Sequence, residues 1–157
     1  MKRLILSAIM LVTLAFNTQA QEISKNALGL RFGDNNGFGG EVSYQRALSR
    51  DNRLELDLGW RNSKNVDAFK LTGIYQWVWN IEQGFNWYAG VGAGAGTYSY
   101  KKESNSFVYA AGDIGIEYNF PIPLLISLDF RPEFGGSGYY KNNYGSDVAL
   151  SLRYQFN

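Results

Sequence analysis

Polar and apolar residues alternate along most of the chain after its first twenty residues. In the segment RLELDLGW (residues 53–60), Arg53, Glu55 and Asp57 alternate with three leucines and a tryptophan. Successive side chains of a strand point to opposite faces, so this segment is expected to form a strand with one charged and one apolar face. In a soluble barrel the charged face meets water. In a membrane barrel the apolar face meets lipid and the charges fill the interior.

Eight such runs are separated by clusters of turn-forming residues, and no window of useful length has a helical period. The runs lie at 26–33, 38–48, 52–62, 67–80, 84–98, 106–120, 123–134 and 147–156. The length of each run is close to or greater than the ~9–11 residues that a tilted strand needs to cross a bilayer. The pattern predicts an all-β, antiparallel chain of eight strands.

The connections between these runs alternate between two kinds. Three are tight: SRDN (49–52), NIEQG (80–84) and NFPIP (119–123). The others are polar and mostly longer: GDNNG (33–37), RNSKNVD (61–67), YKKESNS (100–106) and GGSGYYKNNYGSD (135–147). With an even number of strands, the three tight turns and both chain termini are expected at one end of the barrel. Short turns on one side and longer loops on the other are typical of transmembrane barrels.

The alternation can be followed through all eight runs. The apolar face carries one charge, Arg46, near a strand end, and its aromatic residues gather at the two strand ends, as in the aromatic girdles of a membrane barrel. The opposite face is rich in Arg, Asp and Glu, which suits enclosed ion pairs. We therefore expect lipid outside and a lumen with six positive and seven negative side chains: Arg31, Glu41, Arg53, Glu55, Asp57, Arg61, Lys70, Asp113, Glu117, Asp129, Arg131, Glu133 and Arg153.

Residues 1–20 have the composition of a secretory signal peptide. Lys2 and Arg3 precede an apolar stretch from Leu4 to Phe16, and Thr18 and Ala20 are the small residues that a signal peptidase recognises. An uncleaved anchor is the alternative, but the stretch is short for a membrane-spanning helix. We expect cleavage before Gln21, so that residues 21–157 form one barrel domain.

Composition excludes several classes of protein. Removal of the signal changes the net charge from +1 to −1, which leaves no basic footprint for nucleic acid. The chain has no cysteine, so the exported fold is held without disulfides. It also has no histidine, the commonest general base and metal ligand.

Taken together, these features resemble the small eight-stranded outer-membrane barrels of the OmpA/OmpX-like superfamily. The resemblance covers residues 21–157 and includes the last strand VALSLRYQF, which is similar to the C-terminal signal read by the barrel-assembly machinery, although Asn157 follows the terminal aromatic Phe156. It implies an eight-stranded transmembrane β-barrel in the outer membrane of a Gram-negative cell. The chain ends with its last strand, so a second domain that grips peptidoglycan is not expected. Such an architecture leaves the activity open.

The residues offer little for catalysis. Outer-membrane enzymes of this architecture generally rely on histidine, so the enzyme hypothesis rests on the carboxylate pairs Glu55–Asp57 and Asp129–Glu133, which we interpret as lumen charges neutralised by arginine. The segment GVGAGAG (90–96) lacks the helix that a phosphate-binding loop needs. Its glycines fall on the inward face and should leave room for long Arg and Glu side chains. We predict no catalytic residues, no metal site and no cofactor.

Two classes of function remain. An eight-stranded barrel is just wide enough for side chains to fill it, so a closed, ion-paired lumen is expected. The protein would then act as a structural barrel or dock a partner or surface through external loops, for which Tyr139, Tyr140 and Tyr144 are candidates; interfacial aromatics near lipopolysaccharide would explain the same residues. A narrow channel for ions or small solutes is the alternative, and a histidine-free lipid-modifying enzyme ranks last. Expected partners are outer-membrane lipid and lipopolysaccharide, and the barrel-assembly machinery.

Overall fold

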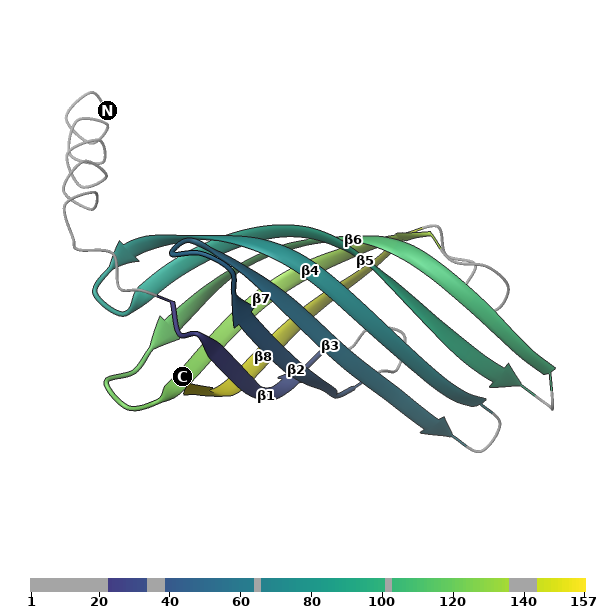
Figure 1. Ribbon diagram of the computed structural model, residues 1–157. Coiled ribbons are helices and arrows are strands. Elements are labelled where there is room, and N and C mark those ends of the chain that lie inside the picture. Colours follow the sequence, from purple (N-terminus) through teal and green to yellow (C-terminus); the bar gives the residue numbers. More distant parts are fainter. Residues whose placement is uncertain (1–22, 34–38, 64–65, 101–102, 136–143) are drawn as a thin grey trace, which may run out of the picture.

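The computed structural model describes residues 23–33, 39–63, 66–100, 103–135 and 144–157. Eight antiparallel strands follow one another around a closed barrel, in which β1 pairs with both β2 and β8 (Figure 1). This confirms the predicted fold class. The strands are β1 (Asn26–Phe32), β2 (Glu41–Ala47), β3 (Asn52–Ser63), β4 (Val66–Glu82), β5 (Phe85–Tyr100), β6 (Glu103–Asn119), β7 (Leu124–Gly135) and β8 (Tyr144–Phe156).

The three tight turns lie at one end of the barrel, here called the turn end; the opposite end is the loop end (Figure 1). The β4–β5 turn uses Gly84 at a φ of +85°, a conformation that L side chains rarely adopt. The Asn119 amide donates to the Gly84 carbonyl over 2.7 Å, which ties this turn to β6. Asn26, the first residue of β1, pairs with Phe156, the last residue of β8, so the barrel also closes at the turn end.

Two of the predicted loops are mostly strand. The segments 61–67 and 100–106 were expected to be loops, but β3 runs to Ser63, β4 starts at Val66, and β6 starts at Glu103. Their polar residues pair across the hairpins: the Asn62 amide donates to Asp67 over 2.8 Å, and the Ser99 and Ser104 hydroxyls lie 2.9 Å apart. Exposed polar pairs of this kind stabilise a hairpin in water. The prediction was wrong because it equated polarity with the end of a strand.

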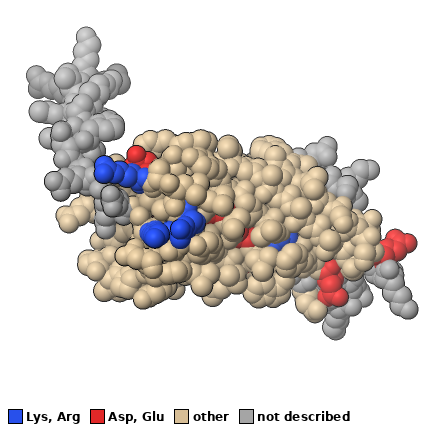
Figure 2. Space-filling view, viewed as in Figure 1, with Lys and Arg blue, Asp and Glu red and all other residues tan. Residues whose placement is uncertain are grey.

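The outer surface of the barrel wall is apolar. Leu56 is 37 % exposed, whereas its neighbours Glu55 and Asp57 are 1 % and 0 % exposed, which confirms the predicted alternation. Figure 2 shows a wall nearly free of charged atoms, with basic atoms gathered towards the turn end. Continuous apolar surface of this extent is not tolerated in water, so lipid covers the wall. None of the described residues forms a helix long and apolar enough to cross a membrane.

An aromatic girdle lies along the turn end over β4, β5 and β6. The rings of Trp79 and Trp87 stack with centroids 4.4 Å apart, and Phe85 and Phe120 lie on either side of Tyr118 at centroid distances of 4.7 Å. These rings extend from β4 to the end of β6. Amphipathic rings collect at the membrane–water boundary, so the girdle marks the level of the lipid headgroups at this end.

A proline interrupts the ladder between β6 and β7. The two strands pair at Ala111–Glu133 and at Ile114–Phe130, with no pairing in between. Pro132 lies in this gap and has no amide hydrogen to donate. The pairing of β7 with β8 continues through Pro132 and Ser146, so the interruption affects only one side of β7.

Candidate functional site

The lumen brings together most of the charged residues that the sequence singled out. Twelve of the thirteen have described side chains, and all twelve lie inside the barrel; the arginines Arg31, Arg131 and Arg153 are at most 1 % exposed. Arg61 pairs with Ala68 in the ladder, but its side chain is outside the described part of the chain. Tyr139 and Tyr140 also lie outside the described residues, and Tyr144 begins β8 with an undescribed side chain.

Arg31, on β1, holds a cluster of carboxylates in the half of the lumen nearer the loop end. Its Nη1 lies 3.0 Å from Glu41 and 2.6 Å from Asp147, and its Nη2 lies 2.5 Å from Asp129. These carboxylates come from β2, β8 and β7. A guanidinium offers five donors in a fixed plane, so one arginine can hold several carboxylates at once. The cluster therefore links four strands.

Lys70, on β4, extends this cluster across the lumen. Its Nζ lies 3.0 Å from Glu41 Oε1 and 3.2 Å from Glu133 Oε1. Glu41 is therefore shared between Arg31 and Lys70. Because β4 is not adjacent to β2 or to β7 in the barrel, these ion pairs cross the interior instead of following the wall.

Arg131 and Arg153 form the middle of the network. Arg131, on β7, reaches β3, where its Nη2 lies 2.7 Å from Glu55 and its Nη1 lies 2.7 Å from Asp57. Arg153, on β8, binds the other oxygen of Glu55 over 3.0 Å and donates to the hydroxyls of Ser43 and Ser127 over 2.9 and 2.8 Å. Glu55 thus joins two arginines from neighbouring strands on the far side of the barrel.

A third group of contacts fills the lumen near the turn end. Arg53 pairs with Glu117 over 2.7 Å, donates to Gln76 over 2.6 Å and lies 4.8 Å from the centroid of the Tyr88 ring. Gln76 donates in turn to Asp113 over 2.5 Å. Little empty space remains between these side chains. The cavity beside Arg53 and Glu117 measures about 10 Å³, which is close to the smallest volume that holds one water molecule.

One charged member of the network, Asp147, and all its neutral members were not among the predicted lumen residues. Asp147 is 3 % exposed and binds Arg31; it shares the inward parity of Arg153, which is the signal that could have identified it. The described network contains five cationic and eight anionic side chains. Neutral donors compensate for part of this difference, because Gln45 and Gln76 donate to Glu55 and Asp113.

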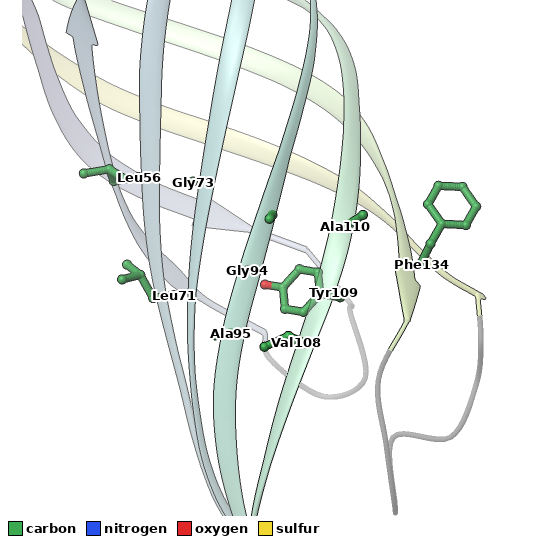
Figure 3. Close-up of a pocket in the computed structure, with 10 residues that line it drawn as sticks. Leu56, Leu71, Gly73, Gly94, Ala95, Val108, Tyr109, Ala110 and Phe134 are labelled. Carbon is green, nitrogen blue, oxygen red and sulfur yellow. The ribbon is translucent and has the colours of Figure 1, made fainter.

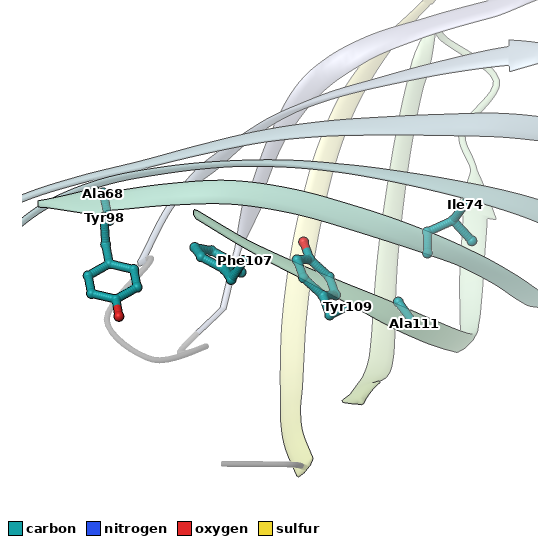
Figure 4. Packing of buried hydrophobic residues seen from close by; sticks show 6 residues of the cluster. All are labelled: Ala68, Ile74, Tyr98, Phe107, Tyr109 and Ala111. Carbon is teal, nitrogen blue, oxygen red and sulfur yellow. The ribbon is translucent and has the colours of Figure 1, made fainter. Parts of the chain in front are cut away.

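Aromatic rings occupy the space left by two of the inward glycines of β5. An ideal Cβ on Gly96 would lie 2.5 Å from the Phe107 ring, and one on Gly94 would overlap the Tyr109 ring. Figure 4 shows these rings and Tyr98 along the inner wall. The expectation that the glycines make room for Arg and Glu is therefore corrected: rings of β6 lie against Gly94 and Gly96, whereas a Cβ on Gly90 or Gly92 would meet atoms of β4 around Ile74. Tyr109 still joins the polar network through a 2.5 Å contact with the Thr72 hydroxyl.

The outer wall has a shallow apolar groove over β4, β5 and β6 (Figure 3). Its floor consists of Gly73, Ala93, Ala95 and Ala110, and larger residues such as Leu56 and Phe134 border it. Gly73, Ala93 and Ala110 are direct neighbours across the three strands. Because it opens on the apolar wall, the groove is part of the lipid-facing surface.

The candidate catalytic carboxylates of the lumen are held in ion pairs. Within the described ranges, no group of three or more His, Cys, Asp or Glu side chains could hold a metal ion. The carboxylate pairs that could carry acid–base chemistry are engaged: Glu55 and Asp57 with Arg131, Asp129 with Arg31, and Glu133 with Lys70. Chemically, the lumen is a set of interlocked ion pairs that joins opposite walls.

Comparison with known proteins gives a likeness of fold. No protein-family model matches the chain, and no curated protein sequence matches it significantly. Among solved structures, the N-terminal barrel domain of Pseudomonas aeruginosa OprF is similar with a TM-score of 0.70 and 13 % identity, over 87 % of this chain and 100 % of that one. Neisserial surface protein A gives a TM-score of 0.60 and 11 % identity, over 83 % of this chain and 94 % of that one.

Ail, the attachment invasion locus protein of Yersinia pestis, gives a TM-score of 0.55 and 19 % identity, over 87 % of this chain and 99 % of that one. At these identities the likeness concerns the fold. Together with the apolar wall and the charged lumen, it identifies the chain as having the fold of the small eight-stranded outer-membrane β-barrels.

Proposed function

We propose that the protein is an integral outer-membrane barrel with a closed lumen, which acts as a structural or surface-docking protein. This proposal rests on the ion-pair network, which fills the lumen from Arg53 near the turn end to Lys70 nearer the loop end. Arg131 links β7 to β3, Lys70 links β4 to β2 and β7, and Arg31, Arg131 and Arg153 are at most 1 % exposed. A solute that crosses the barrel must separate these pairs. The free energy needed for this is far higher than the free energy of passage through an open pore.

The surface-docking part of the proposal rests on the loop end. The hairpins β3–β4 and β5–β6 continue there as polar, exposed strand, so they offer a surface beyond the apolar wall. Tyr139, Tyr140 and Tyr144 lie in or beside the longest connection of the sequence. Ail has been solved with the heparin analogue sucrose octasulfate. A sulfated polysaccharide is therefore a reasonable first ligand to test.

Conductance measurements test the closed lumen. The purified protein in planar bilayers is expected to show no steady conductance over a range of applied voltage. A porin measured in the same bilayers is the positive control. A steady, ion-selective current from the unmodified protein would overturn the closed-lumen proposal and support the narrow channel.

Adhesion measurements test surface docking separately. Cells that display the protein are expected to bind immobilised heparin or epithelial cells better than cells without it. Replacing Tyr139, Tyr140 and Tyr144 together by serine should lower this binding, whereas Arg50→Ser, in a turn at the opposite end, should leave it unchanged. Binding that is equal for all these cells contradicts docking through the loop end and leaves a purely structural role.

A further inference from the structure

One polar cluster lies on the lipid-facing side of the barrel, at the turn end of β1 and β2. It consists of Arg46, Asn26 and Tyr44. Arg46 is exposed and occupies an outward position next to the end of β2, whereas the outward positions of β4 to β6 at this end carry the aromatic girdle. We propose that this cluster binds the phosphate of an anionic phospholipid headgroup in the leaflet at the turn end.

The cluster is organised by one amide oxygen. Arg46 Nη1 and the Tyr44 hydroxyl both donate to Asn26 Oδ1, each over 2.8 Å. Asn26 pairs directly with Arg46 in the ladder and is only 6 % exposed, so it fixes one edge of the guanidinium. Fixing a guanidinium in advance lowers the entropy lost when it binds a ligand. The rest of the planar fork keeps donors for an oxyanion, which it can hold through two parallel hydrogen bonds.

No described acidic side chain neutralises the charge of Arg46. Within the described part of the chain, Arg46 has no carboxylate partner, in contrast to the lumen arginines. Its outward neighbours are apolar: Leu54 pairs with it on β3, and Phe156 pairs with Asn26 on β8. A cation between apolar side chains at a barrel end extends towards the headgroup region, where the available anion is a lipid phosphate.

The surroundings favour a lipid over a soluble anion. Leu48, beyond the end of β2, is 55 % exposed, and Phe156 is 40 % exposed, so apolar surface lies on both sides of the cluster. A phospholipid can contact this surface with its acyl chains while its phosphate contacts Arg46. A free phosphate can use only the polar part. Basic atoms are visible at this end of the molecule in Figure 2, in agreement with an anion-attracting rim.

Native mass spectrometry of the folded protein in detergent tests the proposal. The detergent is supplemented with phosphatidylglycerol, with phosphatidylcholine or with diacylglycerol, which has no phosphate. We expect the unmodified protein to retain phosphatidylglycerol best and diacylglycerol least. Arg46→Gln should lower retention of phosphatidylglycerol about fivefold, the factor that corresponds to the ~1 kcal/mol contributed by a basic side chain near anionic lipid. Asn26→Ala should lower it in the same direction.

The matched control is Arg50→Gln, which removes the same charge from an exposed position at the same end but in the turn after β2. It should retain lipid like the unmodified protein, and Arg46→Lys should retain an intermediate amount. Each variant is first shown to fold by its mobility on unboiled gels. Equal losses for Arg50→Gln and Arg46→Gln, or no loss for Arg46→Gln, overturn the proposal. Displacement of the lipid by millimolar inorganic phosphate would overturn its assignment to a lipid.

Discussion

At the scale of single residues, the lumen is stabilised by arginines that each serve several strands. Arg131 is fully buried, and its guanidinium nitrogens lie 2.7 Å from Glu55 and 2.7 Å from Asp57. Removal of one partner from a buried ion pair leaves a desolvated, unpaired charge. The stability lost in this way is larger than the net stability that the pair contributes. The free energy of unfolding should therefore depend strongly on this one side chain.

Arg131→Met removes the charge and keeps much of the side-chain volume. We expect it to lower the free energy of unfolding by about 3–5 kcal/mol, because Asp57 loses its arginine partner and Glu55 loses one of its two. Urea unfolding of the protein in lipid vesicles measures this change. The double variant Arg131→Met with Asp57→Asn should recover part of the loss, since one stranded charge is gone. Arg50→Met, at an exposed turn, should change the free energy by about 0.5 kcal/mol or less.

Glycines facing the lumen give a second prediction at this scale. A Cβ on Gly115 would lie 2.5 Å from the ring of Tyr88, which is 0 % exposed and cannot move aside. Gly115→Ala should therefore lower the free energy of unfolding by about 1–3 kcal/mol through overpacking.

Gly73→Ala, on the outer wall, is the matched control. Its Cβ would meet only Leu56, at an ordinary 3.5 Å. This variant should be neutral or stabilise the barrel by up to about 1 kcal/mol, because alanine has fewer unfolded conformations. Equal effects of the two substitutions in urea unfolding would show that contact with Tyr88 does not constrain position 115.

At the scale of elements, the alternation of residues predicted much of the fold. The parity of a strand is a local property, so the sequence alone indicated that Glu55 faces inward and Leu56 outward. The strand ends were harder to predict, because the exposed residues near Asn62 and Ser104 form paired strand while resembling loop in composition.

The partners inside the lumen were beyond sequence reasoning. Arg131 and Glu55 are 76 residues apart and meet only because the register of eight strands brings them to the same level. Register and stagger depend on the whole closed sheet, and no local pattern contains them. The rings over Gly94 and Gly96 escaped prediction for the same reason, since the ladder between β5 and β6 places Tyr109 and Phe107 beside them.

A charge on the outer face of β3 tests the orientation of this element. Leu56→Arg should lower the free energy of unfolding in vesicles by about 2–4 kcal/mol, because arginine near the bilayer midplane has no partner there. Leu48→Arg, beyond the end of β2, should cost about 0–1 kcal/mol, because an interfacial arginine reaches water. Similar costs for the two variants would contradict the burial of Leu56 in lipid.

At the scale of the whole molecule, stability depends on closure. β1 has β2 on one side and β8 on the other, and its seven residues from Asn26 to Phe32 all pair with β8. In lipid, backbone groups that lose their partners cannot turn to water, so an open edge within the membrane is strongly unfavourable. A barrel of this kind should fold as one unit, with no stable form that has fewer strands.

Two deletions at the end of β8 test this cooperativity. Removal of residues 150–157 eliminates every β1–β8 pair together with Arg153, and it leaves β1 and residues 124–128 of β7 with an unpaired edge that faces lipid. We expect this chain to show no folded band on unboiled gels and no protease-resistant core after refolding into vesicles. Removal of Asn157 alone preserves the pairing of Phe156 with Asn26, so this variant should fold like the unmodified protein. If the longer deletion gave a compact, heat-modifiable species, then closure between β1 and β8 would not be the condition for folding. The remaining strands would have to satisfy their open edges in another way, such as pairing with a second chain.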